Sequence, residues 1–238
     1  MVVFVKKVGA PINIEEFIKL RKNNYSPNVR GLLGRDLYKI PKKSLILDTG
    51  CGIGNILFSL NHNGFKAENL YGFDIEENLI AFAKGSISAN FFVGTIESIP
   101  VKDEVFDYIA AYDLLEHIPN YNLAVSEMSR VLKRGRIVYM TVADGYSLND
   151  ILFRIGGKII HGRSSHIQKF KKDDVIKLFK RNSFKVKEIN HIKGCLLVYL
   201  SIEKSLPFIL RDIIKSFGKF LGRFMSVAWE FKAMKSDL

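Results

Sequence analysis

Short apolar runs of strand length alternate with amphipathic stretches along most of this chain. The stretch around Leu123, Ala124, Met128 and Val131, for example, places its apolar residues on one helical face. The predicted strands cover residues 45–48, 70–74, 90–94, 105–112, 136–142 and 227–233, and the predicted helices cover 14–21, 56–60, 76–84, 120–133, 148–160, 172–181 and 203–225. Gly135 is expected to cap the helix at 120–133. Strands that alternate with helices in this way predict an α/β fold.

Three glycines at alternate positions follow the first predicted strand. They come directly after Asp48 and before an apolar stretch that begins a helix, at Gly50, Gly52 and Gly54. A strand, a glycine turn and a helix let a ligand approach bare main chain in an α/β protein. The dinucleotide fingerprint has its third glycine three residues after the second, where this chain has Asn55. The spacing therefore disfavours a dinucleotide.

Motif I of the class I, Rossmann-like, S-adenosyl-L-methionine (SAM)-dependent methyltransferases resembles the run Asp48-x-Gly50-Cys51-Gly52-x-Gly54. The likeness to this superfamily extends over roughly residues 44–190. It implies a seven-stranded, mostly parallel Rossmann-like sheet flanked by helices, with the last strand antiparallel. It also implies that the turn residues bind SAM, which leaves the reaction as S-adenosyl-L-homocysteine. An N-terminal helical cap and an amphipathic helix before the last strand complete the predicted fold.

The same resemblance implies further cofactor contacts at the strand ends. The carboxylate of Asp48 would lie near the ammonium group of SAM. Asp74 ends the second predicted strand and would accept hydrogen bonds from both ribose hydroxyls, with Ile75 packed against adenine. Asp74 is also a plausible N-cap for the helix at 76–84, and one carboxylate serves both roles. This part of the chain therefore carries the nucleoside half of the expected site.

The adenine edge departs from the family pattern. Thr95 stands where the family often has an aspartate that binds the adenine amino group. The hydroxyl or main chain of Thr95 is expected to replace that carboxylate, and Ile96 to cover the ring.

The fourth predicted strand leads into Tyr112-Asp113-Leu114-Leu115-Glu116-His117, which resembles the "LEH" segment of small-molecule methyltransferases of this superfamily. Tyr112 and Asp113 are expected to line the pocket near the transferred methyl group, because open α/β sheets present their chemistry at the carboxyl ends of central strands. A hydroxyl acceptor would benefit from a general base, and His117, His166 and Asp113 are the candidates in that order.

Structural roles are the alternatives for both histidines: His117 as a cap of the helix at 120, His166 as an ordinary loop residue. The residues around His166 resemble the region before strand six in quinone- and lipid-type methyltransferases. No Cys/His cluster has metal-site spacing, and no metal is predicted.

The composition of the chain limits which binding partners and which cellular compartment we expect. The 36 basic and 24 acidic residues give a net charge of +12, which would suit nucleic acid or anionic lipid, but the basic residues are scattered and no RNP-like motif is present. Two cysteines, no apolar run of membrane-spanning length and no secretory signal predict a cytoplasmic protein without a transmembrane segment. The amphipathic stretch at 203–225 has three possible roles: packing on the domain, a lid, or peripheral membrane contact.

Together these features predict one domain over residues 1–238, with a cap at 1–43, a cofactor-binding core at 44–145 and a substrate-side half at 146–238. The predicted activity is in-line transfer of a methyl group from SAM to a small-molecule or lipid-like acceptor, such as a prenylated quinone precursor. The alternatives are an RNA methyltransferase, an NAD(P)-dependent reductase and a non-catalytic SAM-binding protein.

Overall fold

A computed structural model describes residue 26 and residues 31–147, 151, 166–193 and 226–237. The strands are β1 (Ile46–Thr49), β2 (Leu70–Asp74), β3 (Asn90–Val93), β4 (Phe106–Ala111), β5 (Leu132–Ala143), β6 (Phe184–Lys193) and β7 (Ser226–Lys235). The helices are α2 (Gly31–Asp36), α3 (Asn55–His62), α4 (Glu77–Ser86), α5 (Tyr121–Val131) and α7 (Lys172–Arg181), with 3-10 turns η1 (Leu37–Lys39), η2 (Ala67–Asn69) and η3 (Leu115–His117).

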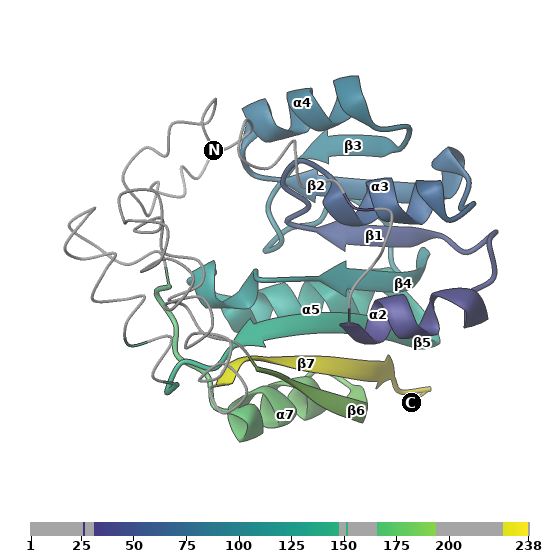
Figure 1. Ribbon diagram of the computed structural model, residues 1–238. Coiled ribbons are helices and arrows are strands. Elements are labelled where there is room, and N and C mark those ends of the chain that lie inside the picture. The colour runs from purple at the N-terminus through teal and green to yellow at the C-terminus, as the bar shows by residue number, and fades with distance from the viewer. Residues whose placement is uncertain (1–25, 27–30, 148–150, 152–165, 194–225, 238) are drawn as a thin grey trace, which may run out of the picture.

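The strands form one seven-stranded sheet in the order β3-β2-β1-β4-β5-β7-β6. Strands β1 to β5 are paired in parallel, whereas β7 runs antiparallel to both of its neighbours, β5 and β6. The arrowheads in Figure 1 show the reversed direction of β7 against β5. The predicted fold class is therefore confirmed.

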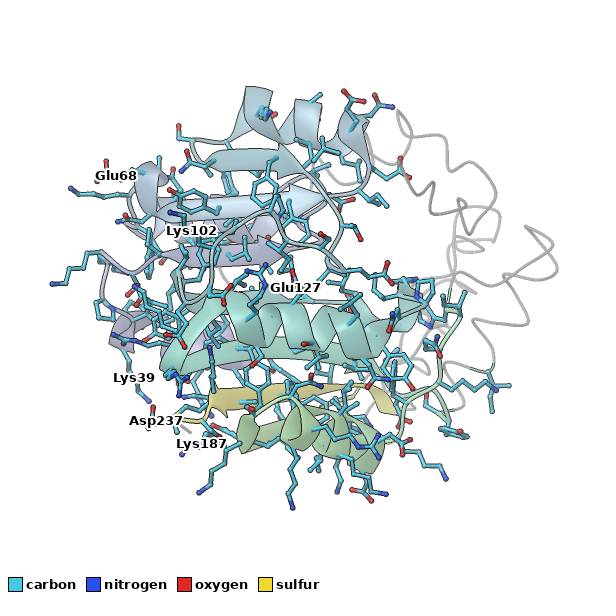
Figure 2. The ribbon with its side chains drawn as sticks, turned by 180° about the vertical axis from the view of Figure 1, so that it is seen from behind. Lys39, Glu68, Lys102, Glu127, Lys187 and Asp237 are labelled. Carbon is cyan, nitrogen blue, oxygen red and sulfur yellow. The ribbon has the colours of Figure 1, made fainter. Side chains whose placement is uncertain are left out.

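Helices cover both faces of the sheet, as a parallel sheet requires. Neighbouring residues of β1 point to opposite sides: Leu47 packs in a cluster with α5 and α7, and Ile46 in a second cluster with α2, α3 and α4. All four residues of β1 are buried, which explains why Ile46 and Leu47 are both apolar although they face opposite sides of the sheet. Figure 2 shows α5, which carries the labelled Glu127, beside α7 on one face.

The short helix α2 is fixed to the last strand by a buried acid. Asp36 is 2% exposed, accepts a hydrogen bond from the Tyr139 hydroxyl at 3.1 Å and forms an ion pair with Lys232 of β7. Burial alone would raise the pKa of Asp36, but the hydrogen bonds from Lys232, Arg35 and Tyr139 outweigh it and lower the pKa to about 2. The end of the chain is thereby linked to the segment that precedes β1.

One boundary differs from the prediction. Helix α5 ends at Val131 and β5 begins at once at Leu132, so Gly135 is not a helix cap. Leu132 is already extended and pairs with Phe106, while Gly135 lies inside the strand with φ of 67°. The glycine provides a left-handed residue near an irregular stretch of the β4–β5 pairing rather than at the helix end.

Several predicted helices lie outside the described residues, namely those at 14–21 and 203–225 and nearly all of the one at 148–160. Within the described part of the chain, no helix has the length and apolar character needed to cross a membrane.

Candidate active site

The glycine turn between β1 and α3 is a tight loop whose main chain is bound to the end of β2. The N–H of Cys51 donates to the carbonyl of Phe73 and the N–H of Gly52 donates to Oδ2 of Asp74, both at 2.9 Å. Gly52 has φ of 54°, and a Cβ added there would meet no atom within 4 Å. The turn thus leaves open space above bare main chain, as a ligand site needs.

Asp74 accepts hydrogen bonds at both of its carboxylate oxygens and is partly buried. Besides the bond from Gly52, its Oδ1 accepts the N–H of Glu76 at 3.0 Å. The N-cap position of α4 is Glu76, so Asp74 is not itself the cap residue. A carboxylate oxygen has two lone pairs, and each oxygen of Asp74 keeps acceptor capacity for a donor outside the chain.

Two apolar side chains lie beside Asp74 in exposed positions. Ile75, which follows β2, is 53% exposed, and Val93, the register partner of Asp74 on β3, is 48% exposed. Large aliphatic side chains are usually covered, so each of these two is unusual in being open to solvent near a hydrogen-bonding acid.

Asp48 and Cys51 are buried beneath the turn. Burial, followed by the charge of Asp74, raises the pKa of Asp48 well above its usual range. Burial also raises the pKa of the Cys51 thiol, which favours the protonated form. A cationic ligand near these acids would favour the charged carboxylates.

The remaining residues predicted to bind the cofactor differ in their burial and in their hydrogen bonds to other parts of the protein. Thr95 accepts the N–H of Glu97 through Oγ1 at 3.3 Å, and Ile96 is 3% exposed inside the core cluster on the α5 side. The Tyr112 hydroxyl donates to Oε1 of the buried Glu230 of β7 at 3.0 Å. The cofactor contacts of these residues stay predictions. Of the two isoleucines predicted to contact adenine, Ile75 is exposed to solvent and Ile96 is buried in the core.

The structure brings together the two candidate histidines from distant parts of the chain. The rings of His117, in η3, and His166, before α7, lie 5.0 Å apart in an edge-on arrangement. The N–H groups of Ile167 and Gln168 donate to the main-chain oxygen of Glu116 at 3.0 and 3.1 Å. These two bonds hold the 166–168 segment against η3, which follows β4.

Glu116 is the residue of this cluster that the sequence analysis did not single out as a site residue. It is 2% exposed; its Oε1 accepts the N–H of Ala143 at 3.3 Å, and its Oε2 is buried without a partner among the described residues. Burial and the nearby charge of Asp113 raise the pKa of Glu116 to about 7, and His166 acts in the opposite direction. Its position before His117 in the "LEH" segment was the only sequence signal.

Asp113 lies at the end of β4 in a left-handed conformation, with φ of 49°. Thr141 of β5 fixes it, since its hydroxyl donates to Oδ1 of Asp113 at 3.2 Å and accepts the N–H of Asp113 at 2.9 Å. A non-glycine residue held in this conformation is a strained feature that often marks a functional position.

The described residues fit a SAM-type cofactor. An acid with spare acceptor capacity lies beside bare main chain and exposed apolar side chains. In addition, Oδ1 of Asn55, directly after Gly54, is buried and has no partner among the described residues. An unpaired buried oxygen at this place is suited to a donor from a ligand.

A mostly parallel sheet of this strand order, with a glycine turn after β1 and an acid at the end of β2, defines the class I methyltransferase fold. Comparison with known proteins agrees, because residues 47–140 match the family described as "Methyltransferase domain". Residues 47–140 therefore form a methyltransferase domain, and the sheet around it has the fold of the class I SAM-dependent methyltransferases.

Three similar proteins illustrate the relationship. An uncharacterized protein of Methanocaldococcus jannaschii is 26% identical over 231 residues, covering 87% of this chain and 85% of the relative. Demethylmenaquinone methyltransferase of Bacillus licheniformis is 27% identical over 103 residues, covering 42% of this chain and 44% of the relative. A SAM-dependent methyltransferase of Methanosarcina mazei superposes with a TM-score of 0.61 at 16% identity, over 88% and 99% of the two chains, and so shares the fold.

Proposed function

We propose that this enzyme transfers the methyl group of SAM to a small, lipid-like acceptor such as a quinone precursor. The observation that carries the proposal is the contact between the glycine turn and the segment after β4. A Cβ at Gly50 would lie 2.7 Å from Cδ1 of Leu114, two residues before Glu116. A cofactor on the turn would therefore have its reactive end near the histidine pair.

In this proposal the turn and its acids hold the cofactor. Asp74 accepts the ribose hydroxyls, Ile75 and Val93 cover the adenine, and Asp48 provides negative charge for the ammonium group. SAM supplies a methyl group already activated by its sulfonium. The chain's own contribution is to align the acceptor, exclude water and accept a proton where the acceptor is a hydroxyl, through His117, His166 or Asp113.

The acceptor class is supported by distant relatives rather than by a bound molecule. The similar proteins include a demethylmenaquinone methyltransferase and, at 32% identity over 42% of this chain, a malonyl-[acyl-carrier protein] O-methyltransferase of Buchnera aphidicola. Both names describe acceptors other than nucleic acid. We place the reaction in the cytoplasm because of the low cysteine content of the chain.

Calorimetric titration with SAM and with S-adenosyl-L-homocysteine tests the cofactor site. Asp74→Asn should lower the affinity for both ligands by about tenfold or more, because it replaces a charged acceptor by an amide. Asp173→Asn, at an exposed position of α7, is the matched control and should bind as the wild type does. Equal affinity of wild type and Asp74→Asn would contradict the assignment.

Transfer of a labelled methyl group tests the acceptor. The enzyme is incubated with methyl-labelled SAM and either a quinone-containing lipid extract, total RNA or buffer. We expect label in the lipid fraction and its loss with excess S-adenosyl-L-homocysteine. Label in RNA alone would overturn the acceptor proposal while leaving the cofactor site intact.

A further inference from the structure

Three potential metal ligands converge at η3, the 3-10 turn that follows β4. Glu116, His117 and His166 each offer one ligand atom, and these atoms all lie within 4.8 Å of one another. Their spacing in the sequence gave no sign of this, because His166 reaches the cluster from the segment before α7. The main-chain bonds from Ile167 and Gln168 to the carbonyl of Glu116 fix that segment in place.

A second observation indicates that the cluster is suited to a cation. The Glu116 side chain is almost completely buried, and its Oε2 has no hydrogen-bond partner among the described residues. Burying a carboxylate oxygen without a donor is energetically costly, so such atoms normally have a partner. A metal ion between Glu116 and the two imidazoles would provide one.

We propose that Glu116, His117 and His166 form a binding site for one divalent transition-metal ion, with Zn²⁺ as the best match. Zinc takes imidazole nitrogen and carboxylate oxygen at about 2.0–2.2 Å, and catalytic zinc sites have three protein ligands and one open position. Mg²⁺ and Ca²⁺ prefer oxygen ligands alone, which this set does not offer. The three ligand atoms already lie within 4.8 Å of one another, and binding of one ion would draw them closer together.

The binding site itself does not depend on the proposed function, whereas its role in catalysis does. The cluster follows the strand end where the acceptor is expected. There, the open position of the ion would bind an acceptor oxygen and lower the pKa of its hydroxyl. This role narrows the acceptor class to molecules that present a hydroxyl or enol oxygen.

The experiment uses the full chain after chelator treatment and dialysis. Titration with Co²⁺, followed by visible absorption, and calorimetry with Zn²⁺ should both give one ion per chain. Glu116→Gln and His166→Ala should each weaken binding by about tenfold or more. The matched control is His62→Ala in the last turn of α3, where His62 stacks on Phe58 with ring centroids 6.3 Å apart, and it should bind as the wild type does.

Circular dichroism shows whether each variant is folded, and His117→Ala, at a partly exposed position, replaces any variant that is not. Absence of stoichiometric binding, or equal loss in His62→Ala and His166→Ala, would overturn the metal site. Failure of the proposed function has a different signature: metal binding is then retained, while no label from SAM reaches the lipid fraction in assays of the same samples. Unchanged methyl transfer by the enzyme after removal of the metal would show that the ion has no catalytic role, and would leave the proposed methyl transfer unaffected.

Discussion

At the scale of single residues, neighbouring glycines of the turn serve different purposes. Both Gly50 and Gly52 have positive φ, at 65° and 54°. A side chain at Gly50 would collide with Leu114, so that glycine permits close packing of the turn against the segment after β4. A side chain at Gly52 would enter open space, so its absence leaves room for something that the chain does not itself provide.

Gly52→Ala is therefore expected to affect binding more than folding. A left-handed alanine costs about 1 kcal/mol of stability, whereas its methyl group occupies the space of the proposed cofactor. We expect a small decrease in melting temperature and SAM affinity lower by about tenfold or more in calorimetry. Gly50→Ala is the comparison and should lose more stability through its contact with Leu114. Wild-type SAM affinity in Gly52→Ala would show that the open space is not the cofactor site.

At the scale of elements, α2 and β7 are joined by two buried acids. Glu230 of β7 is fully buried and accepts the N–H of Leu32 at 2.7 Å and the Tyr112 hydroxyl at 3.0 Å. Asp36 of α2 pairs with Lys232 and Tyr139. Because hydrogen bonds to buried charges are stronger than neutral ones, these acids fix how the helix lies on the strand.

The ion pair of Asp36 should make the free energy of unfolding depend on pH in the acidic range. The folded-state pKa of about 2 lies below the usual 3.8, so the stabilisation is complete above about pH 4 and is lost as pH falls through about 2. A shift of this size corresponds to about 2 kcal/mol. Urea unfolding between about pH 6 and pH 2 should show this loss in the wild type and a flatter profile in Asp36→Asn. The control Asp173→Asn, at an exposed position of α7, should follow the wild type.

Elements with clear local patterns were predictable, and contacts between distant segments were not. The range Leu70–Asp74 of β2 and the range Lys172–Arg181 of α7 agree with the prediction, because each has a strong pattern and a polar boundary. The start of β5 at Leu132 was missed, since its pairing with Phe106 is a tertiary contact. The meeting of His117 and His166 depends in the same way on main-chain bonds to Glu116 that no periodicity reveals.

At the scale of the whole molecule, the strand order makes β7 the strand that joins β6 to the other five strands of the sheet. β7 lies between β5 and β6, and within the described residues β6 has only β7 as a strand neighbour. Phe231 of β7 is fully buried and its ring lies 5.7 Å from that of Phe179 in α7. The C-terminal strand therefore holds β6 and α7, and with them the segment that carries His166, on the rest of the sheet.

Phe231→Ala should consequently destabilise β6 and α7 more than β1 and β2. Removal of a buried phenylalanine side chain costs about 3–5 kcal/mol. Hydrogen exchange should show the largest loss of protection in β6 and α7, while β1 and β2 keep theirs, because local opening follows the elements that share the lost contact. Phe65→Ala removes an equally large buried side chain from the cluster on the opposite face and should leave β6 and α7 protected. A uniform loss of protection in both variants would show instead that the sheet unfolds as a single unit, with no separate role for its last strand.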